Sequence, residues 1–424
     1  MRHVIIGAGP AGVVAAETLR GLDSQAEILL IGDEPEPPYS RMAIPYCLID
    51  MIKEEGTYLR KSEGHYDKLN VEVIQDQVTD LDSDKQSLTL ASGGSQAYDR
   101  LLIATGSHPT SPPIEGIELP GVHSCWTLED ARHIADRATP GSNVVLMGAG
   151  FIGCIILEAL AAREVNLTVV ELENRMVPRM MNEVSGGLIK RWCESKGVQV
   201  LTSTRVEGIS SSKGSHSLDV SLSTGETLQS DLVISATGVA PNASFVKGTS
   251  IEVDHGILVN DQLQTSIEGI FSAGDVAQGR DFSTGEFSVQ AIQPTAVEHA
   301  RIAAINMSDG HESKHQGSLN LNVLSTMGLI SASFGAWEGV DGGDSAELSE
   351  PNGYRYLNLQ FEDDVLVGAH SLGLTAQVGV LRGMICSSLH LGVWKERLMS
   401  NPLNLVQAYV AATQGVGLTA KASG

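Results

Sequence analysis

Cysteine is scarce in this chain, and its arrangement argues against metal binding and cross-linking. The 424 residues contain five cysteines, an odd number, with no Cys-X-X-Cys pair and no spacing typical of metal ligands. We therefore expect neither a disulfide framework nor a metal site, and a cytoplasmic location in which thiols stay reduced. The cysteines are Cys47, Cys125, Cys154, Cys193 and Cys386.

Basic residues and long apolar runs are also lacking. Lys and Arg total 28 against 51 Asp and Glu, a formal charge of −23. Nucleic acids and anionic membrane surfaces bind basic faces, so we predict neither as a partner. The longest apolar stretch, 151–162, is too short to cross a bilayer and contains Glu158. The first predicted strand begins at residue 2 or 3, so we expect no signal peptide.

Glycine, in contrast, is arranged in two similar loops. These are Gly7-Ala8-Gly9-Pro10-Ala11-Gly12 and Gly148-Ala149-Gly150-Phe151-Ile152-Gly153. Each follows a short apolar run and opens into an apolar helical stretch. In such a loop the first glycine permits a tight strand-to-helix turn, the second admits a pyrophosphate, and the third permits close packing. The helix N-terminus then favours the phosphate charge.

The strand that follows each loop ends in acidic residues. The run 27–32 leads to Asp33 and Glu34, and the run 167–170 leads to Glu171. A carboxylate about 20 residues after such a loop accepts a hydrogen bond from a ribose hydroxyl. A chain that builds this arrangement twice can hold two dinucleotides and transfer electrons between them.

The order of the elements predicts three domains. The first unit runs to about residue 107, the second repeats its plan from about 119 to 240, and the character of the sequence changes again from about 317. Prolines and glycines between 109 and 121 mark the first crossing between domains.

The third domain is expected to be α+β. Alternation predicts strands at 354–361 and 365–369 joined by a turn near 363–364, followed by helices at 376–391 and 403–413. The predicted class is α/β, with two dinucleotide-binding domains and this C-terminal α+β domain.

Three further motifs carry a family resemblance. Ala104-Thr105-Gly106 and Ala236-Thr237-Gly238 end two strands, and Ser272-Ala273-Gly274-Asp275 ends a third. With the two loops, in this order, the chain resembles the two-dinucleotide-binding-domain flavoproteins of the pyridine nucleotide-disulphide oxidoreductase superfamily over about residues 1–310. The resemblance implies two Rossmann-like domains, the first binding FAD and the second a nicotinamide dinucleotide. With it, we place a discontinuous FAD-binding domain at 1–118 and 241–316, an NAD(P)-binding domain at 119–240, and a C-terminal domain at 317–424.

The resemblance also assigns residues to the cofactors. Asp275 would hold the ribityl chain of FAD, and Pro294 and Thr295 would direct a helix N-terminus at the flavin ring, where its dipole stabilises negative charge. Val78 stands where the family contacts adenine, although a plain core valine is an equal interpretation. The expected FAD residues are Gly7, Gly9, Pro10, Ala11, Gly12, Asp33, Glu34, Arg41, Val78, Ala104, Thr105, Gly106, Gly274, Asp275, Pro294 and Thr295. The expected NAD residues are Gly148, Gly150, Phe151, Ile152, Gly153, Glu171, Thr237 and Gly238.

Glu171 predicts which nicotinamide cofactor is preferred. A carboxylate there accepts a bond from a ribose 2′-hydroxyl and repels a 2′-phosphate, so we expect NADH rather than NADPH. Arg175, four residues later, could soften that preference. The sequence departs from the family pattern at Ile155, where family members often carry Glu. Glu158 lies three residues further on.

The segment 37–47 separates subfamilies. The CxxxxC pair of the large disulfide reductases is absent, and aligning on Pro45-Tyr46 puts Arg41 or Met42, not Cys47, at the single-cysteine position of other members. The nearest resemblance is to NADH-dependent electron-transfer reductases, such as the nitrite reductase flavoprotein and the rubredoxin or ferredoxin reductases. Arg41 is expected to approach the flavin pyrophosphate.

We therefore predict an FAD-dependent NAD(P)H oxidoreductase. Hydride would pass from NADH to the flavin, and electrons then to a carrier protein, a partner reductase subunit or a small acceptor. One alternative uses Cys47, with Tyr46, in NADH oxidase, peroxidase, or coenzyme A or polysulfide disulfide reductase chemistry. Another is a non-catalytic flavoprotein scaffold or sensor. The resemblance implies a homodimer formed through the C-terminal domain.

Overall fold

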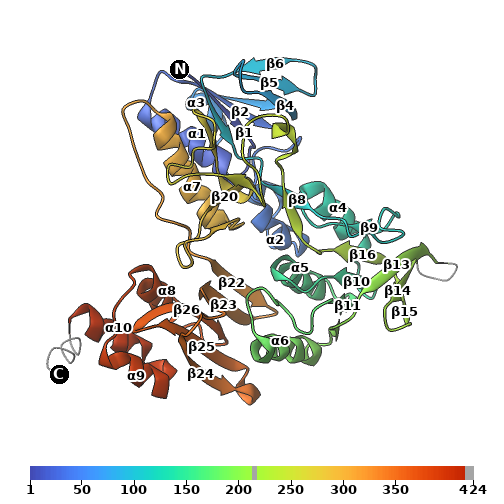
Figure 1. Ribbon diagram of the computed structural model, residues 1–424. Helices are drawn as coiled ribbons and strands as arrows, with labels where there is room; N and C mark the ends of the chain where they lie inside the picture. Colours follow the sequence, from blue (N-terminus) through green and yellow to red (C-terminus); the bar gives the residue numbers. More distant parts are fainter. Residues whose placement is uncertain (213–216, 416–424) are drawn as a thin grey trace. The chain divides into compact units, whose positions relative to one another are not determined.

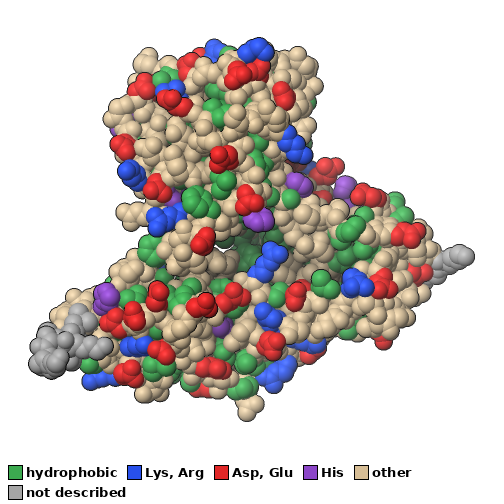
Figure 2. All heavy atoms as spheres, in the orientation of Figure 1, with side chains coloured by type: hydrophobic (Ala, Val, Ile, Leu, Met, Phe, Trp, Pro, Cys, Tyr) green, Lys and Arg blue, Asp and Glu red, His purple; other side chains and the backbone are tan. Residues whose placement is uncertain are grey.

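The computed structural model describes residues 1–212 and 217–415, and contacts between residues divide the chain into two compact units. The first unit comprises 1–47, 52–108 and 239–318. The second comprises 48–51, 109–238 and the part from 319 onward. Figure 1 shows the elements along the chain. In Figure 2 acidic side chains are scattered over the visible face with basic ones between them.

A five-stranded parallel sheet forms the centre of the first unit, in the order β19-β7-β1-β2-β3. Its strands are β1 (Arg2–Ile6), β2 (Glu27–Gly32), β3 (Val71–Gln75), β7 (Arg100–Ile103) and β19 (Ile270–Ser272). The central strands are almost wholly apolar because the sheet is buried on both faces. On one face α1 (Pro10–Leu22) packs against α7 (Gln293–Met307), with alanines at the contact.

Smaller sheets and short helices complete the first unit. The antiparallel strands β4 (Val78–Asp82), β5 (Ser87–Leu90) and β6 (Ser95–Ala97) help to cover the other face. The remaining elements are α2 (Ile44–Leu48), α3 (His65–Lys68), β8 (Ser107–Pro109), β17 (Val239–Pro241), β18 (Ile257–Leu258), β20 (Ala277–Arg280) and β21 (Phe287–Ser288).

The second unit repeats the parallel plan. Its sheet has the order β12-β11-β10-β16-β9. The strands are β9 (Val122–His123), β10 (Asn143–Met147), β11 (Asn166–Val170), β12 (Gln199–Leu201) and β16 (Leu232–Ser235). The helices are α4 (Leu128–Arg137), α5 (Phe151–Ala162) and α6 (Glu183–Ser195), and the antiparallel strands β13 (Val206–Ser211), β14 (Leu218–Leu222) and β15 (Thr227–Ser230) complete this part.

The C-terminal part of the second unit is an antiparallel sheet covered by helices. Its order is β22-β23-β26-β25-β24, from β22 (Leu321–Thr326), β23 (Leu329–Gly335), β24 (Asp344–Glu350), β25 (Arg355–Glu362) and β26 (Val365–Leu372). The predicted hairpin is confirmed, since β25 and β26 pair across residues 363–364. One apolar core joins this sheet to the three helices α8 (Val378–Cys386), α9 (Val393–Ser400) and α10 (Leu405–Thr413).

One predicted helix of this region is wrong. The sequence indicated a single helix over 376–391, but α8 ends at Cys386 and a separate α9 begins at Val393. Ser388 and Gly392 adopt positive φ of 45° and 53°, which no α-helix accommodates. The α/β class with two dinucleotide-binding folds and a C-terminal α+β region is confirmed, while the three-domain boundaries stay a prediction.

Candidate functional site

The two glycine loops have the same backbone construction. Gly7 has φ 109° and Gly148 has φ 97°, a region that favours glycine. A Cβ on Gly7 would lie 2.1 Å from the carbonyl oxygen of Ala104, and one on Gly148 would lie 2.5 Å from that of Ala236. Each loop therefore packs directly on the strand end that carries an Ala-Thr-Gly motif.

The second and third glycines explain how each loop can accept a phosphate. A Cβ on Gly12 or Gly153 would lie 1.9 or 2.2 Å from the carbonyl oxygen of the first glycine in its own loop. In contrast, a Cβ on Gly9 or Gly150 would meet nothing within 4 Å. These middle glycines are the N-caps of α1 and α5 and supply no side-chain cap to the helix N–H groups. Both loops thus fit a dinucleotide pyrophosphate at a helix N-terminus.

Glu171 is held beside the second loop by backbone hydrogen bonds. Its side chain is buried, its Oε2 accepts a hydrogen bond from the backbone N–H of Ala149 at 2.6 Å, and its Oε1 accepts one from that of Glu173 at 2.8 Å. A carboxylate has about four lone-pair sites, so acceptor capacity remains for a ribose diol. The carboxylate position next to the loop is therefore held by the backbone before any ligand binds.

The first loop has no carboxylate at the equivalent position. The backbone N–H of Gly7 donates to the carbonyl of Ile31 at 2.7 Å, and that of Gly148 donates to the carbonyl of Val170 at 2.8 Å. The residue that follows the accepting carbonyl is Gly32 in the first case and Glu171 in the second, so Gly32 is the counterpart of Glu171. A Cβ on Gly32 would lie 2.7 Å from the Cβ of Ala8, which belongs to the loop. The expected acids Asp33 and Glu34 consequently lie one and two residues further along the chain. The sequence alone did not reveal this displacement.

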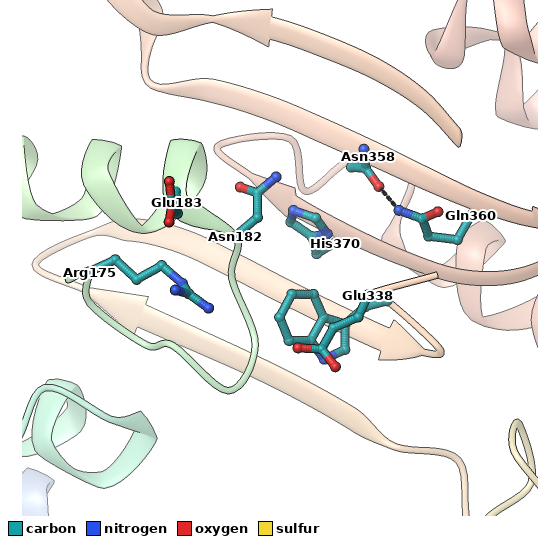
Figure 3. A pocket seen from close by; sticks show the side chains of 8 residues that line it. Arg175, Asn182, Glu183, Glu338, Asn358, Gln360 and His370 are labelled. Carbon is teal, nitrogen blue, oxygen red and sulfur yellow. Dashed lines mark hydrogen bonds between the residues drawn. The ribbon is translucent and has the colours of Figure 1, made fainter. Parts of the chain in front are cut away.

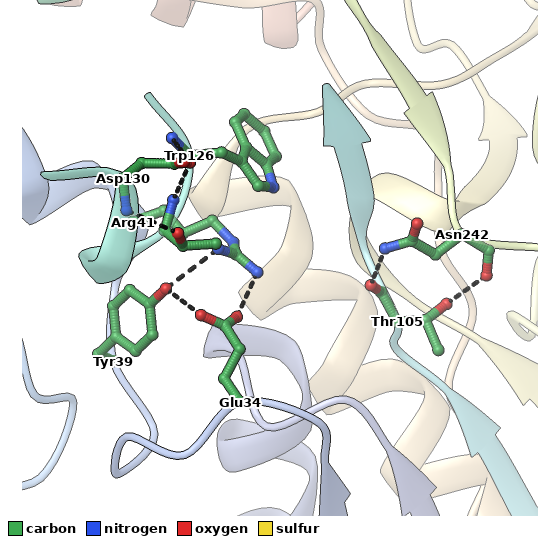
Figure 4. A network of polar contacts seen from close by, with 8 residues as sticks. Glu34, Tyr39, Arg41, Thr105, Trp126, Asp130 and Asn242 are labelled. Carbon is green, nitrogen blue, oxygen red and sulfur yellow. Dashed lines mark hydrogen bonds and ion pairs between the residues drawn. The ribbon is translucent and has the colours of Figure 1, made fainter. Parts of the chain in front are cut away.

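Glu34 belongs to a small polar network in the first unit (Figure 4). Its carboxylate accepts from the Tyr39 hydroxyl and from Arg41 Nη2, the latter at 2.6 Å, and Arg41 Nη1 donates to the Tyr39 oxygen at 3.1 Å. The guanidinium is thereby held by the strand-end acid. Its expected role at the flavin pyrophosphate stays a prediction.

The strand end at Thr105 is also anchored within the first unit. Thr105 Oγ1 donates to the Asn242 carbonyl at 2.8 Å, and Asn242 Nδ2 donates to the Thr105 carbonyl at 2.9 Å (Figure 4). In the second unit Thr237 Oγ1 donates to the Thr110 carbonyl at 3.2 Å. The threonine of each motif therefore ties a strand end to a neighbouring segment.

Asp275 lies beside the N-terminus of α7. Its Oδ2 accepts from Ser107 Oγ at 3.2 Å, and burial raises the pKa of the carboxyl above its usual value. Pro294 occupies the first turn of α7, and a Cβ on Gly274 would lie 3.4 Å from the Cβ of Ala296. The Ser-Ala-Gly-Asp motif at the end of β19 and the N-terminus of α7 are therefore adjacent. A site for the ribityl chain and the flavin ring would require this arrangement.

The remaining candidates are placed as follows. Tyr46 and Cys47 lie on α2, Tyr46 being half exposed and Cys47 partly so. Val78 lies in β4 and is buried in an apolar cluster, while its contact with adenine stays untested. Within the described residues no disulfide forms, no group of His, Cys, Asp or Glu could hold a metal, and no helix is long and apolar enough to cross a bilayer.

Glu158 and Arg175 both hydrogen bond to backbone atoms of the second unit. Glu158 Oε2 accepts from the N–H of Met327 at 3.2 Å. Arg175 Nε donates to the Met181 carbonyl at 2.8 Å and Nη2 to that of Pro178 at 3.2 Å. These bonds hold Arg175 within its own loop.

Comparisons with known proteins agree with this construction. Residues 1–303 match the family model described as pyridine nucleotide-disulphide oxidoreductase. The chain is 28% identical over 414 residues to the epsilon subunit of an NADH-dependent phenylglyoxylate dehydrogenase from Aromatoleum evansii, covering 97% of this chain and 98% of that one.

A second relative and one solved structure cover much of the chain too. A rubredoxin-NAD(+) reductase from Pseudomonas putida is 29% identical, over 72% of this chain and 79% of the relative. The covalent putidaredoxin reductase-putidaredoxin complex matches with a TM-score of 0.88 at 24% identity, over 97% of this chain and 99% of that one. At that identity the match shows the fold.

Proposed function

The chain belongs to the pyridine nucleotide-disulphide oxidoreductase family, and from that premise we propose that it passes electrons from NADH through FAD to a one-electron carrier. As a member it is an FAD-dependent NAD(P)H oxidoreductase. When bound, the two cofactors supply hydride transfer from the nicotinamide to the flavin, so no acid, base or nucleophile of the chain is needed in that step.

The protein contributes binding and electrostatics. We assign the pyrophosphates to the loops at Gly9 and Gly150, where space is open at a helix N-terminus. Asp275 would accept hydrogen bonds from the ribityl hydroxyls, and the N-terminus of α7 would stabilise negative charge on the flavin ring. The paired open loops are the observation that carries this proposal.

NADH is the proposed electron donor. The Glu171 carboxylate would accept a bond from the ribose 2′-hydroxyl and repel a 2′-phosphate. Arg175, which could have favoured a phosphate, donates to carbonyls of its own loop instead. Both observations favour NADH over NADPH.

A one-electron carrier, free or in a partner subunit, is the proposed acceptor. The segment 37–47 lacks a cysteine pair, so the described site offers no dithiol for disulfide reduction. The similar proteins include a rubredoxin-NAD(+) reductase and the epsilon subunit of an NADH-dependent dehydrogenase. The homodimer implied by the family resemblance is tested by light scattering of the purified protein.

An anaerobic NADH titration followed by visible absorption tests the relay. We expect complete bleaching of the flavin at about one NADH per FAD, because the cofactors are the sole electron stores in this proposal. Consumption of a second equivalent, with a long-wavelength charge-transfer band, would instead indicate a redox-active Cys47. A protein that retains no flavin would contradict the proposed function itself.

A further inference from the structure

A cavity in the second unit lies apart from the glycine loop. Its volume is about 300 Å³, at the lower end of the range for small-molecule sites. One side is formed by the segment that leads from Glu171 into α6, and the other by the C-terminal sheet (Figure 3). The lining residues are Arg175, Asn182, Glu183, Trp337, Glu338, Asn358, Gln360 and His370.

His370 is the most informative residue of the lining. It is 2% exposed, and neither ring nitrogen makes a well-formed hydrogen bond to a described residue, although the backbone of Trp337 lies close enough to interact with the ring. Buried polar atoms without partners are uncommon and call for an explanation such as a ligand. Burial lowers the pKa of His370 to about 4, an effect that the nearby Trp337 backbone opposes. At neutral pH the ring is therefore uncharged and offers one donor and one acceptor.

Aromatic side chains hold the His370 ring in place. Tyr356 stacks on it with ring centroids 5.4 Å apart, and Trp337 meets it edge to face, also at 5.4 Å. Asn182 Nδ2 donates to the Tyr356 hydroxyl at 2.7 Å, which ties the N-cap of α6 to the sheet. The unpartnered nitrogens thus belong to a ring with a fixed orientation, a condition for specific recognition.

The other lining groups restrict the chemistry of a ligand. The negative charges of Glu183 and Glu338 disfavour binding of an inorganic anion or a carboxylate. Arg175 is the single cation of the lining, and it already donates hydrogen bonds to carbonyls of its own loop. Asn358 and Gln360 are amides that hydrogen bond to each other, and each amide carries both donors and acceptors. A neutral, planar ligand with donors and acceptors along one edge complements this lining.

We propose that this cavity binds a small neutral nitrogen heterocycle, of the adenine or nicotinamide type, through His370 and the amides of Asn358 and Gln360. The aromatic Trp337 provides an apolar wall for such a ring. The site is additional to the dinucleotide loop, because none of its lining residues belongs to the glycine loop at 148–153.

Isothermal titration calorimetry of the flavin-loaded full chain tests the proposal. Adenosine and nicotinamide are titrated separately at saturating NAD⁺, so that the dinucleotide site is already filled. We expect one or both probes to bind, and whichever binds identifies the type of heterocycle. His370→Phe keeps an aromatic ring but removes both nitrogens, and should weaken binding at least about tenfold. His123→Phe makes the same change in the same unit outside the cavity and should leave binding unaltered.

Gln360→Leu repeats the test if His370→Phe fails to fold, as judged by flavin content and circular dichroism. Absence of binding by both probes, or equal binding by the wild type and the cavity variant that folds, would overturn the proposal. NAD⁺ is titrated alone beforehand, and its failure to bind would contradict the proposed function rather than this cavity. The two proposals therefore fail separately.

Discussion

At the scale of one side chain, Glu171 accepts a hydrogen bond from the glycine loop and is predicted to accept another from the ribose of NADH. Glu171→Gln should raise the KM for NADH by about tenfold or more, because the neutral amide loses the charge of the acceptor and hydrogen bonds to charged groups contribute roughly 1.5–3 kcal/mol. Removing the charge also removes repulsion of a 2′-phosphate, so the preference for NADH over NADPH should fall. The ratio of kcat/KM for the two cofactors, measured with a dye acceptor, checks both effects.

Glu173→Gln is the matched control for this prediction. Glu173 takes part in the network through its backbone N–H, which the substitution retains. Its ratio of kcat/KM values should equal that of the wild type. An unchanged ratio in Glu171→Gln would show that the carboxylate does not select the cofactor.

Cys47 offers a second test at a single residue. If electrons leave the flavin directly for a carrier, Cys47→Ser should keep the rate of carrier or dye reduction within about twofold, since no thiol takes part. Steady-state rates with ferricyanide, peroxide and a disulfide distinguish the acceptors. A selective loss of turnover with peroxide or disulfide would favour the cysteine alternative.

How much of the site the sequence predicts depends on how local each interaction is. The position of Glu171 beside the loop was predictable because this residue directly follows a strand at a fixed distance from the loop, while its role toward the ribose stays a prediction. The displacement of Asp33 and Glu34 was not, because it arises from the close contact between Gly32 and Ala8. The partner of Glu158 is Met327, which lies 169 residues away in the sequence, and no local pattern indicates it.

At the scale of elements, each strand–loop–helix segment can be tested through its middle glycine. A Cβ at Gly150 would meet no protein atom within 4 Å, so Gly150→Ala should fold and keep its flavin. The added methyl would occupy the space predicted for the NAD pyrophosphate and should raise the KM for NADH by an order of magnitude or more. Flavin content and NADH kinetics are the measurements.

Gly9→Ala is the reciprocal variant, since its Cβ is equally free of protein contacts. It should lower flavin retention without disturbing NAD⁺ binding, which calorimetry of the apoprotein measures. Gly187→Ala, also free of neighbours within 4 Å but outside both loops, serves as the control. Equal effects of Gly9→Ala and Gly150→Ala on both cofactors would argue against the assignment of one cofactor to each loop.

Elements with strong periodic patterns were predicted well, and interruptions were not. The β25–β26 hairpin follows from alternation on either side of two aspartates, where Asp363 adopts a φ of 50°. The break between α8 and α9 was missed, because apolar residues continue through Leu389 and Leu391, although Ser387, Ser388 and Gly392 lie in the break. Their burial against the sheet, a tertiary effect, ends one helix and starts another.

At the scale of the whole molecule, buried histidines link stability to pH. Burial lowers the pKa of His3 to about 4, of His299 to about 3 and of His370 to about 4, from an ordinary value of 6.5. Between about pH 6.5 and 4 the unfolded chain binds a proton at each of these positions and the folded chain does not. The free energy of unfolding should therefore fall on acidification through this window, by about 1.4 kcal/mol per pH unit for each such histidine.

His299→Gln isolates one of these contributions. The amide can retain a hydrogen bond to Ser318 Oγ, which His299 Nε2 contacts at 3.0 Å, but cannot be protonated near neutral pH. Between pH 6.5 and 4, the free energy of unfolding of the variant should fall less steeply than that of the wild type, the two slopes differing by about 1.4 kcal/mol per pH unit. Urea unfolding at several pH values measures both slopes. The exposed His311→Gln should retain the slope of the wild type. Parallel slopes for the wild type and His299→Gln would mean that His299 does not titrate differently in the two states. The pKa of the Glu17 carboxyl is lowered by its bonds to Arg60 and His65, so its contribution to stability is lost at the acid end of this window and below it, whereas the histidine contributions are lost from about pH 6.5 downward.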